Sequence, residues 1–371
     1  MANAAGVAPL DFPVASQYST RHSFQITPTT LAASSLTTPT PVQIPAVGYL
    51  NGILLEVTID GTGGTTPAWV GDAPWSVIES VTLRNAAGVN LIAPVTGFQL
   101  FTMGLYGGQT HFGPAADTRN GLHAPGAYSA STNFFVWLPV GMDISEAYGV
   151  IPALQSNASY QVAFTFAAQS SVTTSNPTLT VSVDATAHYF DVPLEMTANG
   201  VPQESMPPGM PAQVFWQIEQ PSVAPGTQLI QSNNVGNLIR TVVFTLRNSS
   251  GARTDADWPA LFEVYLNNQP RFSFRKSEFE FMMERWYGAL AGSTKSLVTP
   301  NSLIPGVFAL PYHALLGSYA GDPANTRAQI LPTLTSSLVQ YRAQDWGASA
   351  SRLEIMTQVV STTNAAYLFS K

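Results

Sequence analysis

The sequence predicts an all-β fold made of two tandem eight-stranded jelly rolls, a double jelly roll in which each unit has a short helix and elaborated loops. Three observations lead to this prediction: short β-rich runs, frequent turn residues, and a set of features that occurs twice. Gly and Pro number 28 each in the 371 residues. Between them lie runs rich in Val, Ile, Thr, Phe and Tyr, a pattern typical of short strands joined by turns.

One stretch of sequence occurs in two similar copies along the chain. DAPWSVIESVTLRN at residues 72–85 and DADWPALFEVYLNN at residues 255–268 both begin Asp-Ala and place Trp at the fourth position. Both then continue through an apolar run into a turn. Trp75 and Trp258 therefore mark equivalent points of two units. Chance alone could give one such pair, so the features around each copy decide the interpretation.

A strand precedes each copy. Residues 49–60 and residues 238–247 alternate apolar and other side chains with a period of two, which predicts strands with one buried face. The inward-facing residues are expected to be Ile53, Leu55, Val57 and Ile59 in the first unit and Leu238, Val242, Phe244 and Leu246 in the second. In both units, the repeated series of elements thus begins with a strand.

A short helix follows each copy. The helices are predicted at residues 96–108 and residues 277–288, and Ser277 is expected to be the N-cap of the second. They end in Leu-Tyr-Gly and Trp-Tyr-Gly, so Tyr106 and Tyr287 occupy matching positions. Apolar residues at helical spacing in the second helix are expected to pack into the core.

A strand containing Leu-Pro comes next in both units: FVWLPV carries Pro139 and VFALPY carries Pro311. Three paired features in one order indicate a tandem duplication of a unit of about 170 residues, a usual size for one domain. The expected division is an N-terminal arm at 1–20, a first jelly roll at 21–195, a linker at 196–210 and a second jelly roll at 211–371.

The composition is poor in charge. Only 10% of the residues are charged, against about 25% in an ordinary globular protein. Much of the surface is therefore expected to be covered by partners or to consist of Ser, Thr, Asn, Gln and backbone. The net charge is −7, and the densest basic patch, Arg271, Arg275, Lys276 and Arg285, is interleaved with glutamates. Direct, extensive nucleic-acid binding is not expected.

The sequence lacks the residues that several kinds of chemistry require. The chain has no Cys, which excludes disulfides and thiol catalysis. There is no Gly-x-Ser-x-Gly elbow and no phosphate-binding glycine loop before a helix. We therefore expect no enzyme activity, no catalytic residue, no cofactor and no metal site. His111 and His123 flank Asp117 in one loop, but their spacing is too loose to favour a metal site over ordinary loop residues.

The twin Asp-Ala-x-Trp stretches, the twin Tyr-Gly helix ends and the twin Leu-Pro strands resemble double-jelly-roll major capsid proteins. These form the shells of tailless icosahedral double-stranded DNA viruses, including tectivirus-like bacteriophages. The resemblance covers about residues 20–371 and depends on architecture, order and size. It implies a structural virion protein, assembled in the host cytoplasm, whose homotrimers form nearly hexagonal tiles because two similar rolls per copy give six similar walls.

The resemblance also implies partners. Neighbouring trimers, penton proteins and minor capsid proteins would contact each tile, and an internal lipid membrane could lie beneath it. The arm would reach a neighbour or that membrane, with Val7, Leu10, Phe12 and Val14 as candidate anchors. The loops at 107–131 and 288–305 are expected to form an outer tower.

A second class of function is also considered. A glycan-binding or glycan-cleaving β-sandwich protein, such as a receptor-binding spike or adhesin, would use exposed tryptophans as stacking platforms. Trp75 and Trp258 are more often core residues at such strand entrances. A glycosidase needs two carboxylates across a cleft, and sequence does not pair them.

Overall fold

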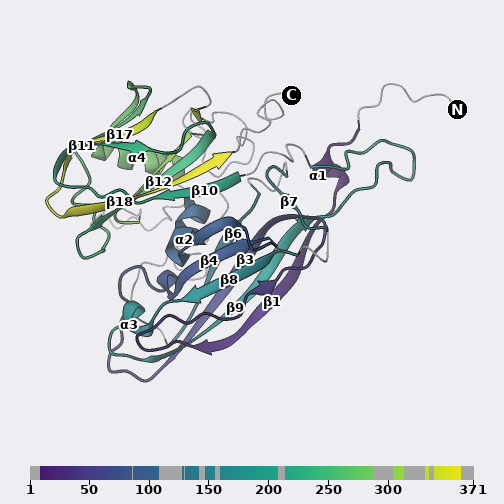
Figure 1. Cartoon of the computed structure of the whole chain (residues 1–371), viewed down its shortest axis with the longest axis horizontal. Helices are drawn as coiled ribbons and strands as arrows, with labels where there is room; N and C mark the ends of the chain where they lie inside the picture. Colours follow the sequence, from purple (N-terminus) through teal and green to yellow (C-terminus); the bar gives the residue numbers. More distant parts are fainter. Residues whose placement is uncertain are drawn as a thin grey trace.

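The protein is described from a computed structural model with two lobes, one formed by each half of the chain (Figure 1). The residues that the structure describes are 9–85, 87–107, 128, 130–141, 147–154, 159–207, 214–287, 304–312, 331–333 and 338–360. Both predicted tower loops fall largely outside these ranges, as do His111, Asp117, His123 and Val7. Among the described helices, none is long and apolar enough to cross a membrane.

Roll 1 is a sandwich of two antiparallel sheets formed by the first half of the chain. One sheet has the order β1-β9-β3-β6, with the short β7 also paired to β3, and the other has the order β2-β8-β4-β5. The strands are β1 (Tyr18–Thr30), β2 (Val42–Gln43), β3 (Tyr49–Thr62), β4 (Ile78–Arg84), β5 (Asn90–Val95), β6 (Ser131–Pro139), β7 (Ile151–Pro152), β8 (Gln161–Phe166) and β9 (Thr178–Phe190).

Roll 2 repeats this arrangement. One sheet has the order β10-β18-β12-β15, with the short β16 also paired to β12, and the other has the order β11-β17-β13-β14. The strands are β10 (Val214–Glu219), β11 (Gly226–Ser232), β12 (Leu238–Asn248), β13 (Leu261–Leu266), β14 (Gln269–Arg275), β15 (Val307–Pro311), β16 (Leu331–Pro332), β17 (Val339–Trp346) and β18 (Ala350–Val360).

The two rolls have one topology. Counting strands in chain order, every strand of roll 1 has the same neighbours as its counterpart in roll 2, including the extra two-residue strand. Even the pairing register is shared. Gly52 lies opposite Pro139, Thr241 lies opposite Pro311, and a register shift precedes both Gly52 and Thr241. The prediction of a double jelly roll is confirmed.

The helices join equivalent strands in the two rolls. In roll 1, α2 (Gly97–Tyr106) connects β5 to β6, and in roll 2, α4 (Lys276–Tyr287) follows β14 and precedes β15. Helix α4 begins at Lys276, so Ser277 is its second residue and the prediction that Ser277 is the N-cap is wrong. The remaining helices are α1 (Phe12–Ala15), α3 (Gln169–Val172) and the 3-10 turn η1 (Trp75–Val77).

Alternation explains the strands that were predicted best. Ile53, Leu55, Val57 and Ile59 have at most 1% of their surface exposed and form part of the main core. Strand β1 was not predicted, because its Thr- and Pro-containing sequence reads as loose extended chain. It forms because its backbone pairs with β9 along most of its length, and a sheet ladder satisfies every second backbone group whatever the side chains.

The turn after β13 shows how the repeat differs locally. Asn267 and Asn268 have φ of 51° and 61°, the left-handed values of the two-residue turn that best fits twisted hairpins. In roll 1 the corresponding turn places Gly88 at φ 79°. Both turns therefore use residues that tolerate positive φ, by different chemistry.

Candidate functional site

The feature that joins the two rolls is α2, which lies where the two lobes meet (Figure 1). Its first turn has a complete capping box. The Thr96 hydroxyl accepts a hydrogen bond from the Gln99 backbone N–H at 3.1 Å, and the Gln99 side chain accepts one from the Thr96 N–H at 2.8 Å. All ten helical residues are buried. A helix buried on every side needs its end groups satisfied internally, and this box supplies that.

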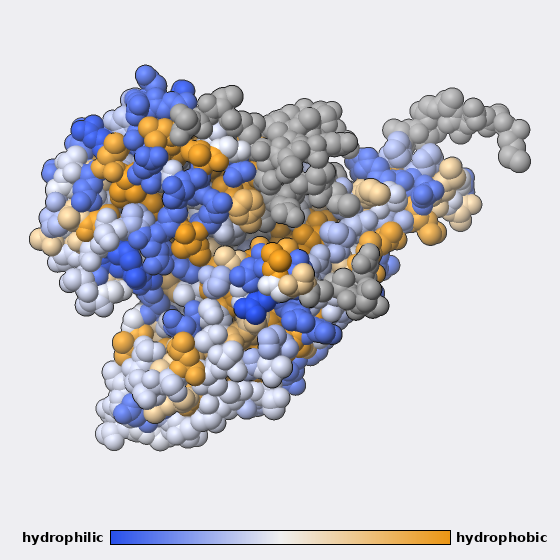
Figure 2. All heavy atoms as spheres, in the orientation of Figure 1, coloured by the Kyte–Doolittle hydropathy of each residue, from blue (hydrophilic) through white to orange (hydrophobic). Residues whose placement is uncertain are grey.

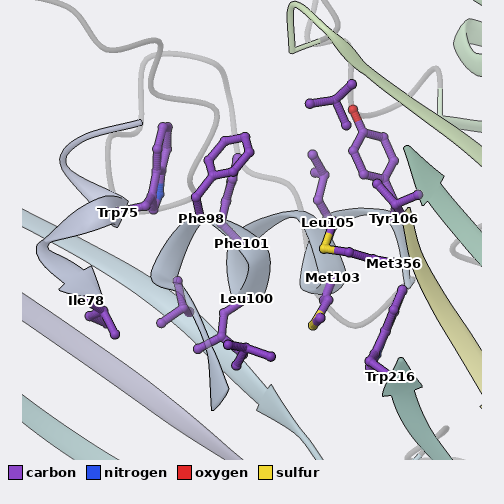
Figure 3. Packing of buried hydrophobic residues seen from close by; sticks show 14 of the residues in the cluster. Trp75, Ile78, Phe98, Leu100, Phe101, Met103, Leu105, Tyr106, Trp216 and Met356 are labelled. Atoms are coloured by element: carbon purple, nitrogen blue, oxygen red, sulfur yellow. The ribbon is translucent and has the colours of Figure 1, made fainter. Parts of the chain in front are cut away.

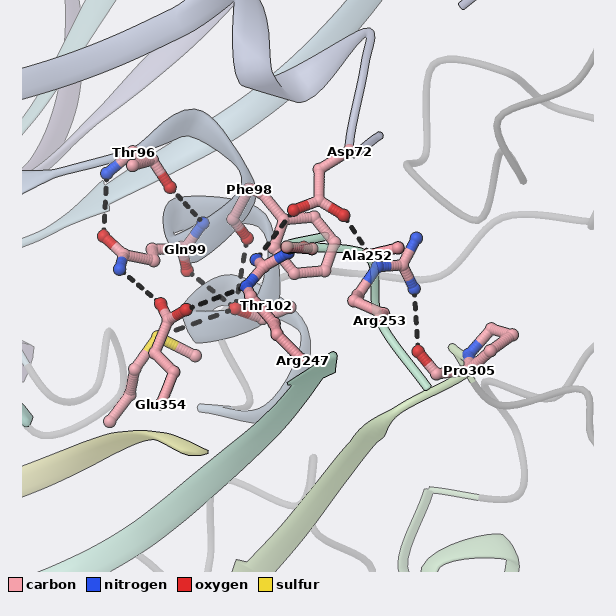
Figure 4. A network of polar contacts seen from close by, with 12 residues as sticks. Asp72, Thr96, Phe98, Gln99, Thr102, Arg247, Ala252, Arg253, Pro305 and Glu354 are labelled. Atoms are coloured by element: carbon pink, nitrogen blue, oxygen red, sulfur yellow. Dashed lines mark hydrogen bonds and ion pairs between the residues drawn. The ribbon is translucent and has the colours of Figure 1, made fainter. Parts of the chain in front are cut away.

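A buried ion network crosses from roll 1 to roll 2 beside this helix (Figure 4). Asp72 of roll 1 accepts from Arg247 at 2.7 Å and from Arg253 at 2.7 Å, both of roll 2. Arg247 also lies 3.4 Å from Glu354, and Gln99 donates to Glu354. Burial alone would lower the pKa of Arg247, but Asp72 and Glu354 outweigh it and raise that pKa. The network therefore attaches roll 1 to roll 2 through buried ion pairs.

Phe98 of α2 adds an aromatic contact to the same network. The guanidinium carbons of Arg253 and Arg247 lie 4.8 and 5.7 Å from the centre of its ring. Both distances are within the range of cation–π attraction, which strengthens when water is excluded. The arginines of roll 2 are therefore held by a carboxylate and a ring of roll 1 together.

The far end of α2 is held by roll 2 as well. Arg240 donates from one nitrogen to the Gly107 carbonyl at 2.8 Å and to the Gln358 side chain at 2.7 Å. A cation at a helix C-terminus is stabilised by the helix dipole and caps a free carbonyl. Trp216 of β10 lies against the same glycine, and Met356 approaches the helix beside Met103 and Leu105 (Figure 3).

The repeat-marking tryptophans are core residues. Trp75 is 3% exposed and stacks on Phe101 with ring centres 4.3 Å apart. Trp258 is 4% exposed and stacks on Phe308 at 3.8 Å. They precede the fourth strands of their rolls, β4 and β13. Because both rings are buried, neither is available as a platform for a glycan in this structure.

The other repeat markers lie at matching places. Tyr106 is buried near the end of α2, and burial raises its pKa. Tyr287 is the last residue of α4. Pro139 and Pro311 are buried at the ends of β6 and β15. Sequence order alone located these positions. The tyrosines end the two helices, and the prolines end the strands that come after those helices.

One residue of the predicted N-terminal arm packs into the fold. Phe12, in α1, is fully buried against Tyr49 and Phe190. The interpretation of Phe12 as an anchor for lipid or a neighbour is therefore corrected, because its ring fills a cluster of its own chain. Leu10 is 37% exposed and pairs with Gln203, whereas Val14 is 71% exposed.

The open face of roll 1 belongs to the β1-β9-β3-β6 sheet. Its outward residues include Leu54, Phe135 and Trp137, which are half-buried. Trp137 lies edge-on to His188 at 4.8 Å, and the Tyr18 hydroxyl is 2.7 Å from His188 Nδ1. Burial lowers the pKa of His188. The sequence did not single out this face, since its residues alternate with core positions in an ordinary strand pattern.

A groove of about 770 Å³ lies between the rolls, lined by β5, the end of β6 and β10. Glu219 is the only carboxylate among the described residues that line it. That carboxylate already accepts hydrogen bonds from Ser232 at 2.8 Å and Asn233 at 2.7 Å. A glycosidase needs two carboxylates facing each other, so these residues do not form such a pair. The described residues also contain no cluster of three potential metal ligands.

The inter-roll network was missed by sequence reasoning, although one signal for it was present. Asp72 is the first residue of the duplicated stretch, and Asp255 is its counterpart. In roll 2, Asp255 accepts from the Gly306 N–H at 2.7 Å inside its own roll. The repeated position therefore has two different uses, and only the structure distinguishes them.

The fold is that of double-jelly-roll major capsid proteins. The structure of the STIV major capsid protein, from Sulfolobus Turreted Icosahedral Virus, aligns with a TM-score of 0.62 and 12% identity, over 96% of this chain and 100% of that one. PBCV-1 VP54, in a structure fitted to the virophage Sputnik, aligns with a TM-score of 0.58 and 11% identity, over 93% and 94%. The Faustovirus major capsid protein gives 0.51 and 8%, over 96% and 91%.

No protein-family model matches the chain, and no curated protein matches it in sequence. The likeness to the three viral proteins is thus a likeness of fold at low identity. Those three proteins are structural components of virus shells.

Proposed function

We propose that this chain is a major capsid protein whose homotrimers form pseudo-hexagonal capsomers of an icosahedral shell. The observation that carries the proposal is the shared topology of the two rolls. Two equivalent sandwiches in one chain give three copies six similar walls, and repeated similar walls allow a ring to close by heterologous contacts. The proposed role is structural, without enzyme activity, and its location is the virion after assembly in the host cytoplasm.

The surface composition supports extensive contact with partners. The lower part of roll 1 is mostly pale in the space-filling view, so residues of intermediate hydropathy cover that part of the visible face (Figure 2). Charged residues are depleted from the centres of protein interfaces. The proposed partners are other copies of the chain, then penton and minor capsid proteins, with no extensive contact to nucleic acid.

The proposed domain boundaries are an arm at 1–20, rolls at 21–195 and 211–371, and a linker at 196–210. Within the arm, Leu10 and Val14 stay candidates for contact with a neighbouring capsomer or an internal membrane, because their side chains are exposed. Val7 belongs to the same proposal.

Size-exclusion chromatography with light scattering tests the proposal directly. The purified chain should have three times the monomer mass of 39.6 kDa, and negative-stain images should show six-lobed particles. A glycan array serves as the control and should show no binding. Monomers at every concentration would overturn the capsomer, and specific sugar binding would favour a receptor-binding protein instead.

A further inference from the structure

We propose that His188 is an acid-sensitive latch, which holds the start of the chain on roll 1 and releases it when the imidazole is protonated. The part that is held, here called the strap, is residues 11–18, comprising α1 and the first residue of β1. Release would uncover Phe12, so the chain would offer this aromatic side chain to a partner only in acid. The inference goes beyond the proposed capsid role.

The strap packs on roll 1 through two aromatic side chains. Phe12 is fully buried in a small cluster apart from the main core, with its ring centre 5.5 Å from Tyr49 and 5.9 Å from Phe190. Tyr18 packs edge-on against Phe190 at 5.1 Å. A four-residue helix and the end of an edge strand have few contacts to lose, so local opening costs least in such a segment.

The polar contact of the strap at this point is with His188 of β9. The Tyr18 hydroxyl lies 2.7 Å from His188 Nδ1, whereas the other ring nitrogen, Nε2, is buried and has no hydrogen-bond partner among the described residues. The Trp137 ring lies edge-on to His188 at 4.8 Å and extends over Gly52, where a Cβ would clash with it. The imidazole is therefore enclosed by Tyr18 from β1 and Trp137 from β6.

Protonation makes this enclosure unfavourable. The imidazolium has two N–H donors: the Tyr18 oxygen can accept from Nδ1, but the described residues offer no acceptor to Nε2. A charged, partly unpaired ring between two aromatic side chains is costly, and burial lowers the pKa of His188. In the open state water reaches the ring, which then titrates near pH 6.5. The open state therefore binds more protons as the pH falls below about 6.5, and closure weakens there.

The described groups that face His188 bring no charge to stabilise the imidazolium. They are the Tyr18 phenol from β1, the Asn51 amide and Gly52 from β3, and the Trp137 indole from β6. Two ion pairs also join β1 to β9 or to the residue after it, Arg21 with Asp191 at 3.9 Å and His22 with Asp184 at 3.5 Å. Burial, and neither of these pairs, is the cause of the lowered pKa of His188.

Roll 2 has the same position without a titrating group. His188 pairs with Gly52, and Gln358 pairs with Thr241, the counterpart of Gly52. Gln358 is fully buried, and its side chain accepts a hydrogen bond from Arg240 at 2.7 Å. An amide side chain thus fits this place in the sheet, which makes His188→Gln the variant that removes the titration and keeps a polar side chain there.

A single buried thiol can measure the opening of the strap. The chain has no Cys, and Ser16 is 9% exposed with a hydroxyl that lacks a partner among the described residues, so Ser16→Cys should fold. Its rate of reaction with a pyridyl disulfide, divided by that of an unfolded peptide of the same sequence at the same pH, gives the opening constant. Between about pH 7.5 and about pH 5 this constant should rise several-fold, by up to about tenfold for each pKa unit by which closure lowers the pKa of His188.

Three variants locate the effect. His188→Gln, combined with Ser16→Cys, should give an opening constant that does not change with pH. His22→Gln in the same background should leave the rise intact. Val183→Cys is the matched control thiol: Val183 is a fully buried residue of β9, and this thiol should stay protected at both pH values. Circular dichroism at neutral pH should show every variant folded.

An opening constant at Ser16→Cys that is independent of pH would overturn the latch, and so would an equal rise in the His188→Gln background. Equal rises at Ser16→Cys and Val183→Cys would overturn it as well, because the whole roll would then open. The measurement needs no trimer. A chain that stays monomeric would therefore contradict the capsomer and leave the latch standing, whereas a trimer without acid-dependent opening would contradict the latch alone.

Discussion

The two sheets at equivalent places in the rolls have opposite surroundings. Strand β3 of roll 1 alternates buried and half-buried residues from Ile53 to Ile59, the pattern of a sheet with one open face. Strand β12 of roll 2 is buried at every residue from Leu238 to Arg247. The topology and the register are the same, so the difference comes from what covers the outer face.

Helix α2 provides that cover for roll 2. It places Thr241, Thr245 and Arg247, whose sequence pattern is that of a solvated face, in the interior of the molecule. Buried charge is tolerated only where it is paired and hydrogen-bonded, and the Asp72–Arg247–Glu354 network meets that condition. A duplicated unit thus acquired a second core between its copies, and the open face of roll 1 is the surface still without such a cover.

The aromatic stack on each repeated tryptophan shows the same divergence on a smaller scale. Trp75 stacks on Phe101 from the helix, and Trp258 stacks on Phe308 from strand β15. Register places Phe308 at the position of Val136 in β6. Each roll fills one ring-sized space beside its tryptophan, but from a different element.

Breaking the buried network should have the largest effect. Arg247→Ala leaves the carboxylates of Asp72 and Glu354 short of a partner, and we expect a loss of about 3–5 kcal/mol in the free energy of unfolding. Urea denaturation measures it. Arg342→Ala is the control, since Arg342 pairs with Glu263 at 3.5 Å with 42% of its side chain exposed, and should change stability by at most about 1 kcal/mol. Equal effects would contradict the comparison.

Exchanging the residues beside the two tryptophans should destabilise both rolls. Phe308→Val leaves a cavity beside Trp258 and should cost about 2–3 kcal/mol, somewhat less than a full truncation to Ala. Val136→Phe places a second ring where Phe101 already stacks and should cost about 1–3 kcal/mol by overpacking. Thermal unfolding of both variants measures these losses. A neutral Val136→Phe variant would show that roll 1 has room for both rings.

One substitution on the buried outer face of β12 is expected to make the protein more stable. The Thr245 hydroxyl is buried and has no hydrogen-bond partner among the described residues, a situation that costs about 1–3 kcal/mol. Thr245→Val keeps the shape and should raise stability by about 1 kcal/mol in denaturant titration. Thr58→Val, on the half-open face of β3, should stay within about 0.5 kcal/mol of wild type. A destabilised Thr245→Val variant would indicate a water or partner at that hydroxyl.

The smallest expected effect is a pH dependence that His188 gives to roll 1. Burial lowers the pKa of His188 in the folded state, whereas the unfolded chain titrates near pH 6.5. The unfolded state therefore binds more protons as the pH falls below about 6.5, and stability declines there. His188→Gln, which installs the residue of the counterpart position Gln358, should reduce this decline. Unfolding free energies between pH 8 and pH 5 measure it, and parallel curves would contradict it.

Local patterns predicted much of the fold. Period-two alternation located β3 and β12, and the paired Trp, Tyr-Gly and Leu-Pro features ordered the elements around them. Strand β1 was missed because its side chains carry little signal and its pairing with β9 joins distant residues. Phe12 was misjudged for a related reason: an isolated aromatic in an irregular segment does not reveal that Tyr49 and Phe190 form a space for it.

The sequence by itself determined that the chain is a duplicated β-sandwich protein with little charge, because strand periodicity, turn residues and repeated motifs are local properties. Only the tertiary structure decided that α2 is enclosed between the rolls while α4 keeps Phe281 exposed. It also decided that Asp72 pairs with Arg247 across the rolls, whereas its counterpart Asp255 accepts a hydrogen bond from Gly306 of its own roll. Burial and ion pairing depend on which surfaces meet, and two copies of one motif meet different surfaces when one lies between the rolls and the other on the outside.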